Sequence, residues 1–416
     1  MNMNRLMTWA SAGLAALVFA VSAQAQQPLK IGFGMSLTGP LAGNGKAALI
    51  AMQIWAEDVN AKGGILGRKV ELVYYDDQTN PSTVPSIYNK LLDVDKVDLV
   101  VSGYGTNVIA PAMPIMMQRN MVFMSLFGLN VNSKFNYDRY FQIMPAGPEP
   151  AVGWSQGYFD IAMTLNPKPQ TVALVGADAE YPALALEGAR AHVKKLGLKV
   201  VYDKSYPPNT VDFSPIVRAI QATNPDIVFL ASYPPDSAGM VRAVNEVGLK
   251  TRMFGGGLVG PQFASLRTQL GPLLNGIVNY ESYTPEVAAK YPFLEQFLAK
   301  YQGRAVKEGV DPLGFYLPPY AYAMMQVLEQ AIKATGSLDQ AQLAEYMHKY
   351  EFDTYVGKVR FAKNGEWSAP RMLTVQYHGV VGNDLEQWMK AGHVTVLAPA
   401  AYATGTVQTP YQDSKK

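Results

Sequence analysis

The sequence predicts an α/β protein made of two doubly wound domains, each with a mostly parallel sheet. Short apolar runs alternate with helical stretches over two consecutive thirds of the 416-residue chain, a pattern typical of parallel α/β layers. Between the two series lies IMPAGPEPA, whose prolines at 145, 148 and 150 favour an extended crossover. A second crossover is expected near NYESYTP, so the chain should pass between the domains more than once.

The first 25 residues contain the three parts of a secretory signal peptide. Arg5 precedes an apolar run over residues 10–20, and Ala23-Gln24-Ala25 offers small residues at a cleavage site. We expect cleavage after Ala25. No later stretch approaches the roughly 18 uninterrupted apolar residues of a membrane span, so we expect a soluble, exported mature chain.

In the first third, four apolar runs are expected to be strands and residues 47–61 a helix. Leu49, Met52, Ala56 and Val59 recur at helical spacing, and a Gly-Gly pair follows the helix. The expected strands are LKIGFGM, VELVYYD, VDLVVSG and MVFMSL.

The second third repeats this scheme, and a helical region follows it. The expected strands are TVALVGA, KVVYDKS, DIVFLAS and RMFGGG. The helices between them are expected near 183–196, 215–223 and 237–247. Helices that should cover the first domain are expected around 292–301, 319–334 and 338–350. The tail past Asn383 is rich in Ala, Thr and Pro and is interpreted as a partly irregular strap.

The composition excludes several classes of site. There is no cysteine, which excludes a disulfide framework, a zinc–cysteine cluster, a thiol nucleophile and a lipidated N-terminal cysteine. The formal net charge is only +2 and long basic runs are absent, which argues against a nucleic-acid partner. The four histidines show no short metal-ligand spacing, so no metal and no cofactor are expected.

Two segments come close to motifs of catalysis or nucleotide binding. GPLAGNGKAA resembles a phosphate loop, but Pro40 replaces the first glycine and Ala47 replaces the magnesium-binding hydroxyl residue. GWSQG matches the nucleophile-elbow pattern around Ser155, but it follows a proline-rich crossover instead of a buried strand. Carboxylates such as Asp76-Asp77 end a strand, where capping and solvation explain them. We therefore expect no enzyme.

Aromatic and hydroxyl residues gather just after the predicted strands. Ligands of open α/β sheets bind at the carboxyl ends of the strands, so these residues are candidates for a binding site. They are Tyr104, Thr106, Ser125, Phe127, Tyr181 and Tyr233.

Several segments at consistent spacing resemble the branched-chain amino-acid-binding (Leu/Ile/Val-binding) family of type I periplasmic solute-binding proteins, which serve ABC importers. They are KIGFGMSLTGPLAGNGKAA, AEDVNAKGGILGRKVELVYYDDQTNP, VDFSPIVRAIQATNPDIVFLASYPPDSAGMVRAVNEVGLK and VGKVRFAKNGEW. The resemblance implies a periplasmic receptor, expected to be a monomer, that passes a small molecule to membrane permease subunits. It also implies two lobes joined by a three-segment hinge, with lobe 1 at 26–146 plus 283–365 and lobe 2 at 147–282 plus 366–416.

In this family the ligand carboxylate is typically held by backbone N–H groups at helix N-termini and by a hydroxyl. By resemblance, Thr106 is that hydroxyl, the backbone of Phe127 contacts the ligand, and Asn44 touches it from the first loop. Tyr181 and Tyr233 close over it from lobe 2.

Two residues depart from the family pattern. Leu129 stands where amino-acid binders commonly have a threonine, and Gly257 stands where they commonly have an acidic residue against the α-ammonium. A buried ammonium without a countercharge is costly, so we expect an aromatic or hydrophobic carboxylate that lacks an α-amino group. The alternative is a branched-chain or other hydrophobic amino acid, with Asp178 or Glu180 supplying the charge. Two readings of another class are an exported enzyme and a sensory partner.

Overall fold

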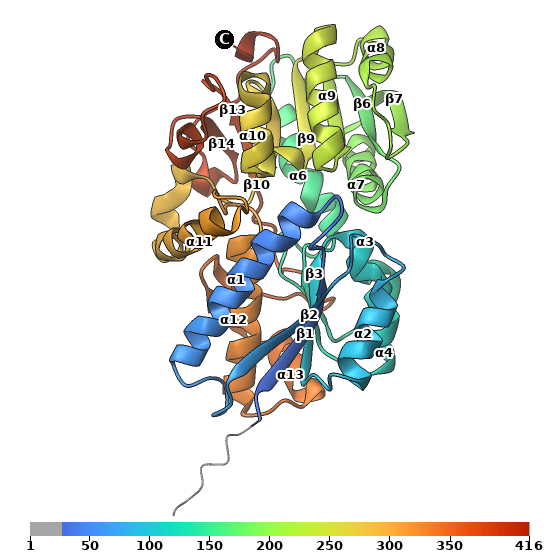
Figure 1. Ribbon diagram of the computed structural model, residues 1–416. Helices are drawn as coiled ribbons and strands as arrows, with labels where there is room; N and C mark the ends of the chain where they lie inside the picture. The colour runs from blue at the N-terminus through green and yellow to red at the C-terminus, as the bar shows by residue number, and fades with distance from the viewer. Residues whose placement is uncertain (1–26, 416) are drawn as a thin grey trace, which may run out of the picture.

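The computed structural model describes residues 27–415, and its two large sheets lie one above the other along the long axis of the molecule (Figure 1). The described chain begins at the bottom of Figure 1 and ends at the top, so its two ends lie at opposite poles. The predicted signal peptide and its cleavage site lie outside the described residues. Within residues 27–415, no helix has the length and apolar character needed to cross a membrane.

The lower sheet, with the helices around it, is called lobe 1. Its five parallel strands have the order β2-β1-β3-β4-β5. They are β1 (Leu29–Met35), β2 (Val70–Asp76), β3 (Leu99–Tyr104), β4 (Phe123–Leu126) and β5 (Tyr140–Gln142). The predicted first four strands are confirmed, whereas β5, with three residues, is too short to show a pattern in the sequence.

Helices cover both faces of the lobe 1 sheet. α1 and α12 lie together on one side of it and α2, α3 and α4 on the other (Figure 1). The bounds are α1 (Ala42–Ala61), α2 (Val84–Asp93), α3 (Thr106–Ile109), α4 (Met113–Gln118) and α5 (Asn132–Phe135). The predicted later helices are confirmed as α11 (Leu294–Glu308), α12 (Pro318–Thr335) and α13 (Gln340–Lys349). A hairpin of β11 (Glu351–Thr354) and β12 (Gly357–Arg360) follows them.

Helix α1 begins at Ala42, earlier than the predicted position 47. The loop after β1 turns directly into the helix, and the helix then passes very close to that loop. A Cβ atom on Gly45 would lie 1.9 Å from the carbonyl oxygen of Ser36, so only glycine fits there. Lys46 is exposed. Gly45 of GPLAGNGKAA is therefore needed for close packing of the helix against the loop, which explains why the segment resembles a phosphate loop.

The upper sheet defines lobe 2, with strand order β14-β13-β10-β9-β8-β6-β7. Its strands are β6 (Thr171–Ala177), β7 (Lys199–Tyr206), β8 (Ile227–Ser232), β9 (Met253–Leu258), β10 (Val278–Glu281), β13 (Leu373–Tyr377) and β14 (Val394–Ala398). β13 pairs antiparallel with both β10 and β14, and the remaining pairs are parallel. The tail thus contributes an edge strand, followed by irregular chain.

The helices of lobe 2 pack on both faces of its sheet. They are α6 (Pro150–Ala162), α7 (Glu180–Leu196), α8 (Ser214–Ala222), α9 (Pro234–Val247) and α10 (Ala264–Leu270). Three of them match the predicted helices. α6 begins at Pro150, at the end of the segment 143–151 that was expected to be an extended crossover; Pro150 occupies the first helical turn, where its missing N–H costs nothing.

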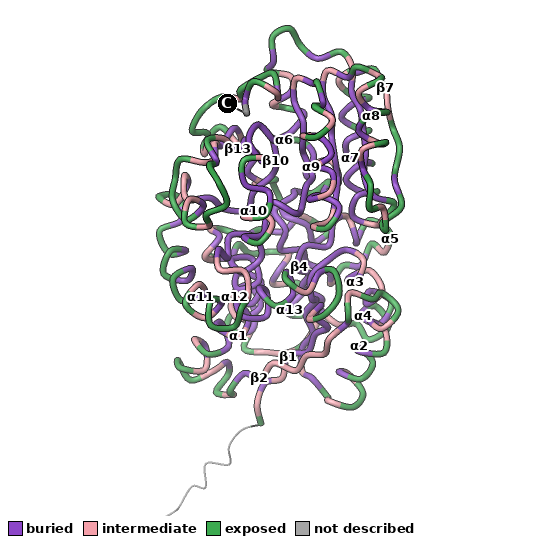
Figure 2. Tube along the Cα trace, turned by 45° about the horizontal axis from the view of Figure 1, so that its top comes forward, coloured by how far each residue is buried: buried purple, intermediate pink, exposed green. Residues whose placement is uncertain are grey.

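The chain passes between the lobes three times, after β5, after β10 and after β12. The first and third crossovers run side by side and are joined by a hydrogen bond from Arg371 N–H to the carbonyl oxygen of Pro145 at 2.8 Å. Buried residues extend through both lobes and across their junction (Figure 2). The fold is therefore two doubly wound lobes on a three-segment hinge.

Candidate ligand site between the lobes

A small cavity lies where the two lobes meet. Residues of both lobes line it, and six of the nine predicted site residues are among them. The lining consists of Tyr104, Gly105, Thr106, Phe127, Leu129, Met144, Trp154, Tyr181, Tyr233, Val259 and Tyr316. None of these lining residues is charged.

Thr106 is the hydroxyl of the lobe 1 wall. It begins α3 directly after Gly105, whose φ of 112° turns the chain out of β3. Its Oγ1 accepts a hydrogen bond from Leu129 N–H at 3.0 Å, and the side chain is 2 % exposed. Because the oxygen is already an acceptor, its hydrogen remains available for an anionic group in the cavity.

Phe127 holds a strained backbone conformation at the cavity wall. Its φ is 58°, which a bulky residue rarely adopts and which is common at ligand-binding sites. Gln142 fixes the turn by accepting Phe127 N–H through Oε1 at 3.1 Å, and the ring packs edge-on against Tyr316 and Tyr320. Ser125 lies behind this turn, with its hydroxyl facing the Gln142 amide, and does not line the cavity.

Tyr181 forms the centre of the lobe 2 wall. It lies in the first turn of α7, accepts a hydrogen bond from Trp154 Nε1 at 3.2 Å and donates one to the carbonyl oxygen of Gly257 at 2.8 Å. A Cβ atom on Gly257 would lie 3.2 Å from the Tyr181 hydroxyl. Gly257 therefore does not line the cavity, and the phenol of Tyr181 occupies the space beside it.

Two buried polar atoms near the cavity make at most weak hydrogen bonds, one to the backbone of Tyr181 and the other to the phenol of Tyr104. They are the hydroxyl of Tyr233 and Nδ2 of Asn44. Tyr233 precedes α9 and its ring lies 5.5 Å from that of Tyr181, whereas Asn44 lies in the first turn of α1, near Tyr104, and does not itself line the cavity. Poorly paired buried polar groups are costly, so the hydroxyl of Tyr233, which lines the cavity, is positioned to gain from a polar ligand.

Sequence reasoning missed Tyr316, which joins the two walls. Its hydroxyl lies 3.2 Å from that of Tyr104 in lobe 1 and 3.5 Å from that of Tyr280 in lobe 2. Burial raises the pKa of all three phenols, so they remain protonated donors at neutral pH. The aromatic segment GFYLPPY, which runs into the first turn of α12, was the available signal for Tyr316, but it follows no strand.

Trp154, Met144 and Val259 were also missed. Met144 lies in the first crossover and Trp154 in α6 just beyond it, while Val259 follows β9. Ser155, the centre of GWSQG, lies inside α6, and its hydroxyl faces carbonyl oxygens of the preceding turn. This placement agrees with a packing role and not with a nucleophile on a sharp turn.

The carboxylates considered as countercharges lie outside the cavity lining. Asp178 is exposed and Glu180 is half-buried. Burial raises the pKa of Glu180. Asp236, which was not predicted, is buried in α9 and accepts the Tyr206 hydroxyl at 2.6 Å; burial raises its pKa to about 6. Within residues 27–415, no cluster of three or more His, Asp or Glu side chains is suited to a metal ion.

Comparisons with known proteins agree with this geometry. A family model described as periplasmic binding protein matches residues 28–379. An amino acid binding protein of Pseudomonas aeruginosa is 27 % identical over 357 residues, which cover 84 % of this chain and 90 % of that protein. The Leu/Ile/Val-binding protein of Escherichia coli is 25 % identical over 376 residues, 85 % of this chain and 92 % of that protein.

Solved structures show the same fold. A leucine-binding protein from Thermotoga maritima has a TM-score of 0.72 at 21 % identity and covers 89 % of this chain and 98 % of its own. An ABC transporter solute-binding protein of R. palustris in complex with benzoate has a TM-score of 0.70 at 16 % identity, over 89 % of this chain and 95 % of its own.

Two lobes on a three-segment hinge, with a cavity between them, define the type I periplasmic binding proteins, a class of solute receptors and not of enzymes. The chain belongs to the periplasmic binding protein family and is a substrate-binding protein of the ABC transporter type.

Proposed function

We propose that the protein captures a small aromatic or hydrophobic carboxylate without an α-amino group between its lobes and delivers it to the permease subunits of an ABC importer. The observation that carries this proposal is the absence of charged side chains among the residues that line the cavity. A carboxylate can be held there by Thr106 and by backbone N–H groups, since neither needs a countercharge.

An α-ammonium group would be desolvated in the same cavity without a partner. The position beside Gly257 is filled by the phenol of Tyr181, which is neutral and already hydrogen-bonded. Desolvating an unpaired ammonium costs several kcal/mol, so a deaminated acid should bind more tightly than the matching amino acid. The benzoate complex of the R. palustris protein supports this ligand class by analogy of fold.

The tyrosine rings favour a flat apolar ligand. In lobe 2, the ring centroids of Tyr181 and Tyr233 lie 5.5 Å apart. In lobe 1, the rings of Tyr104 and Phe127 pack edge-on against Tyr316. Edge-on contacts of such rings with an aromatic ligand are worth about 0.5–1.5 kcal/mol beyond area burial.

A hydrophobic amino acid is the second candidate. Leu129, Met144 and Val259 give the cavity an aliphatic part, and the E. coli relative is named a Leu/Ile/Val-binding protein. In that case Glu180, half-buried in the first turn of α7, would have to turn toward the ammonium.

Calorimetric titration of one protein preparation with leucine, phenylalanine, benzoate and a phenylpropenoate separates the two candidates. We expect benzoate or the phenylpropenoate to bind most tightly, and tighter binding of either amino acid would overturn the proposal. Mass spectrometry of the released ligand distinguishes a receptor, which returns it unchanged, from an exported enzyme.

The proposal also includes the lobe boundaries and the oligomeric state, in addition to the permease as partner. We place lobe 1 at 26–146 plus 283–365 and lobe 2 at 147–282 plus 366–416, in a monomer. Light scattering of the purified protein with and without ligand tests the monomer, and a dimer in both states would contradict it.

A further inference from the structure

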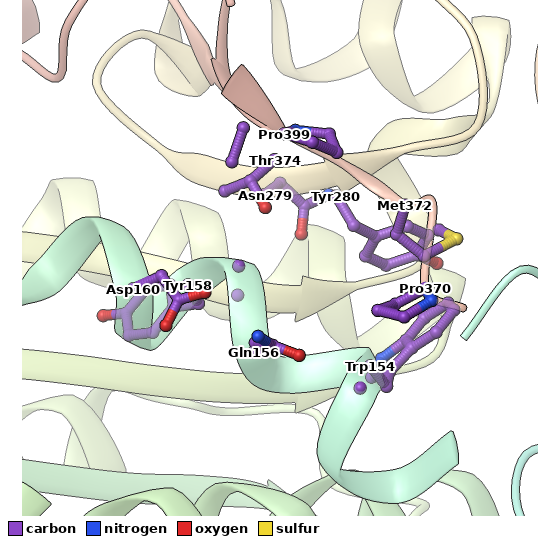
Figure 3. Close-up of a pocket in the computed structure, with 14 residues that line it drawn as sticks. Trp154, Gln156, Tyr158, Asp160, Asn279, Tyr280, Pro370, Met372, Thr374 and Pro399 are labelled. Atoms are coloured by element: carbon purple, nitrogen blue, oxygen red, sulfur yellow. The ribbon is translucent and has the colours of Figure 1, made fainter. Parts of the chain in front are cut away.

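A second and larger cavity lies behind the ligand site, in lobe 2. It encloses about 660 Å³, part of it open to solvent, between α6 on one side and β10, β13 and β14 on the other (Figure 3). The third crossover closes one end of it with Pro370 and Met372, which lie beside Trp154 in Figure 3. Gln156 and Asp160, on the α6 side, are exposed, so the cavity reaches the surface.

Trp154 is the residue that this rear cavity and the ligand cavity share among their described linings. Its indole is 5 % exposed and its ring lies 4.3 Å from that of Tyr280. Its Nε1 donates to Tyr181 on the ligand side. Trp154 therefore lies between the smaller ligand cavity and the larger rear cavity.

The two glycines of GWSQG hold the backbone of Trp154 in place. A Cβ atom on Gly153 would lie 1.8 Å from the carbonyl oxygen of Ala146, and one on Gly157 would lie 1.9 Å from Oγ1 of Thr374. α6 is thus pressed against the first crossover at one point and against β13 at the other. Because the helix cannot easily shift, the size of the side chain at position 154 determines where the ligand cavity ends.

We propose that Trp154 sets the maximum length of the ligand by closing the deep end of the binding cavity against the rear cavity. With the carboxylate held at Thr106 in lobe 1, the tail of the ligand points toward Trp154 in lobe 2. This inference rests on the proposed function for the orientation of the ligand, but the separation of the two cavities does not depend on it. Short acids fit in front of the indole, and longer homologues collide with it.

The test compares wild type with Trp154→Ala in calorimetric titrations of benzoate and 4-butylbenzoate. Wild type should prefer benzoate. The variant should bind 4-butylbenzoate at least about tenfold more tightly than wild type does, since even one methylene group in an apolar pocket changes affinity by about tenfold or more. It should bind benzoate more weakly. An unchanged chain-length preference in the variant would overturn the proposal.

Two further variants strengthen the comparison. Trp154→Phe keeps an aromatic ring and should give a chain-length preference between those of wild type and Trp154→Ala. It replaces Trp154→Ala in the test if that variant folds poorly. Gln156 lines the rear cavity and not the ligand cavity, so the single variant Gln156→Leu should leave the chain-length preference unchanged. In the Trp154→Ala background it should tighten 4-butylbenzoate binding, because the tail then reaches it.

The same titrations with valine and 2-aminooctanoate, a short and a long amino acid, repeat the test for the second ligand class. The series that binds then shows whether the ligand is a deaminated acid or an amino acid. If neither series binds wild type, the proposed function fails, and crystal structures of wild type and Trp154→Ala then decide the separate question of the partition. One continuous cavity in the variant supports it, and collapse of Tyr181 or Tyr280 into the vacated space overturns it.

Discussion

The hydroxyl of Tyr181 donates a hydrogen bond to the carbonyl oxygen of Gly257 at 2.8 Å, and any Cβ atom on Gly257 would lie 3.2 Å from that hydroxyl. The two residues are therefore matched: the small residue makes room for the phenol. The wall of the cavity beside Gly257 is therefore neutral.

Removing this hydroxyl should weaken ligand binding. In Tyr181→Phe, the Gly257 carbonyl and Trp154 Nε1 lose their partner, which should lower the free energy of unfolding by about 1–3 kcal/mol. Because Trp154 loses its anchor, the ligand affinity should also fall, by about tenfold. Urea unfolding and calorimetry measure the two effects.

Tyr158→Phe is the matched control for stability. Its hydroxyl donates to the carbonyl oxygen of Val228 at 2.7 Å inside lobe 2, away from the ligand cavity. It should lose stability and keep its affinity. Equal affinities in both variants would show that the hydroxyl of Tyr181 is only structural.

Thr106 should matter for affinity more than for stability. Thr106→Ala removes the hydroxyl that we expect to receive the ligand carboxylate, at a cost of about 1–3 kcal/mol in binding. Ser102→Ala is its counterpart in β3, because the Ser102 hydroxyl likewise accepts a backbone N–H, that of Leu126, at 2.7 Å. Calorimetry should show weaker binding in the first variant only, and an unchanged dissociation constant in Thr106→Ala would refute its role.

Asp236 should make stability fall as the pH rises. Burial raises its folded-state pKa from 3.8 to about 6, although the Tyr206 hydroxyl partly offsets this. The folded state therefore holds this proton more tightly than the unfolded state, a benefit present below about pH 4 and lost as the pH rises through about 6.

The loss amounts to roughly 3 kcal/mol. The measurement is the difference in unfolding free energy between wild type and Asp236→Asn, by urea titration from pH 3.5 to 7. Wild type should lose stability relative to the variant across this range. A difference that is flat or moves in the opposite direction contradicts the assignment.

Two glycines of α1 should respond oppositely to alanine. Gly45→Ala places a methyl group 1.9 Å from the Ser36 carbonyl oxygen and should lower the free energy of unfolding by about 1–3 kcal/mol or more. Gly43 is exposed and has no atom within 4 Å of its Cβ position, so Gly43→Ala should raise it by about 0.5–1 kcal/mol. Thermal unfolding of the pair decides whether the packing of α1 on the strand-end loop is as tight as described.

The sequence predicted the sheets better than the cavity. Alternating apolar runs identified the principal strands, and the rule that ligands meet strand ends found Thr106 and Tyr181. It could not show which way a strand-end side chain points. Ser125 faces the Gln142 amide instead of the cavity, because the left-handed turn at Phe127 redirects the chain.

Trp154 and Tyr316 were missed for a different reason. Both reach the cavity from segments that follow crossovers, so no strand marks them. Their places depend on contacts between parts of the chain that are far apart in sequence, such as Tyr316 with Tyr104 and Trp154 with Tyr280, and such contacts leave no local pattern.

The opposite positions of the two chain ends have a practical consequence. The described chain starts at the far end of lobe 1 and finishes at the far end of lobe 2 (Figure 1). A movement of one lobe relative to the other about the hinge would therefore change the end-to-end distance. Because the sequence has no cysteine, one cysteine introduced near each end would give two defined attachment points for dyes. Single-molecule energy transfer between the two dyes would convert this protein into an optical sensor of its own solute.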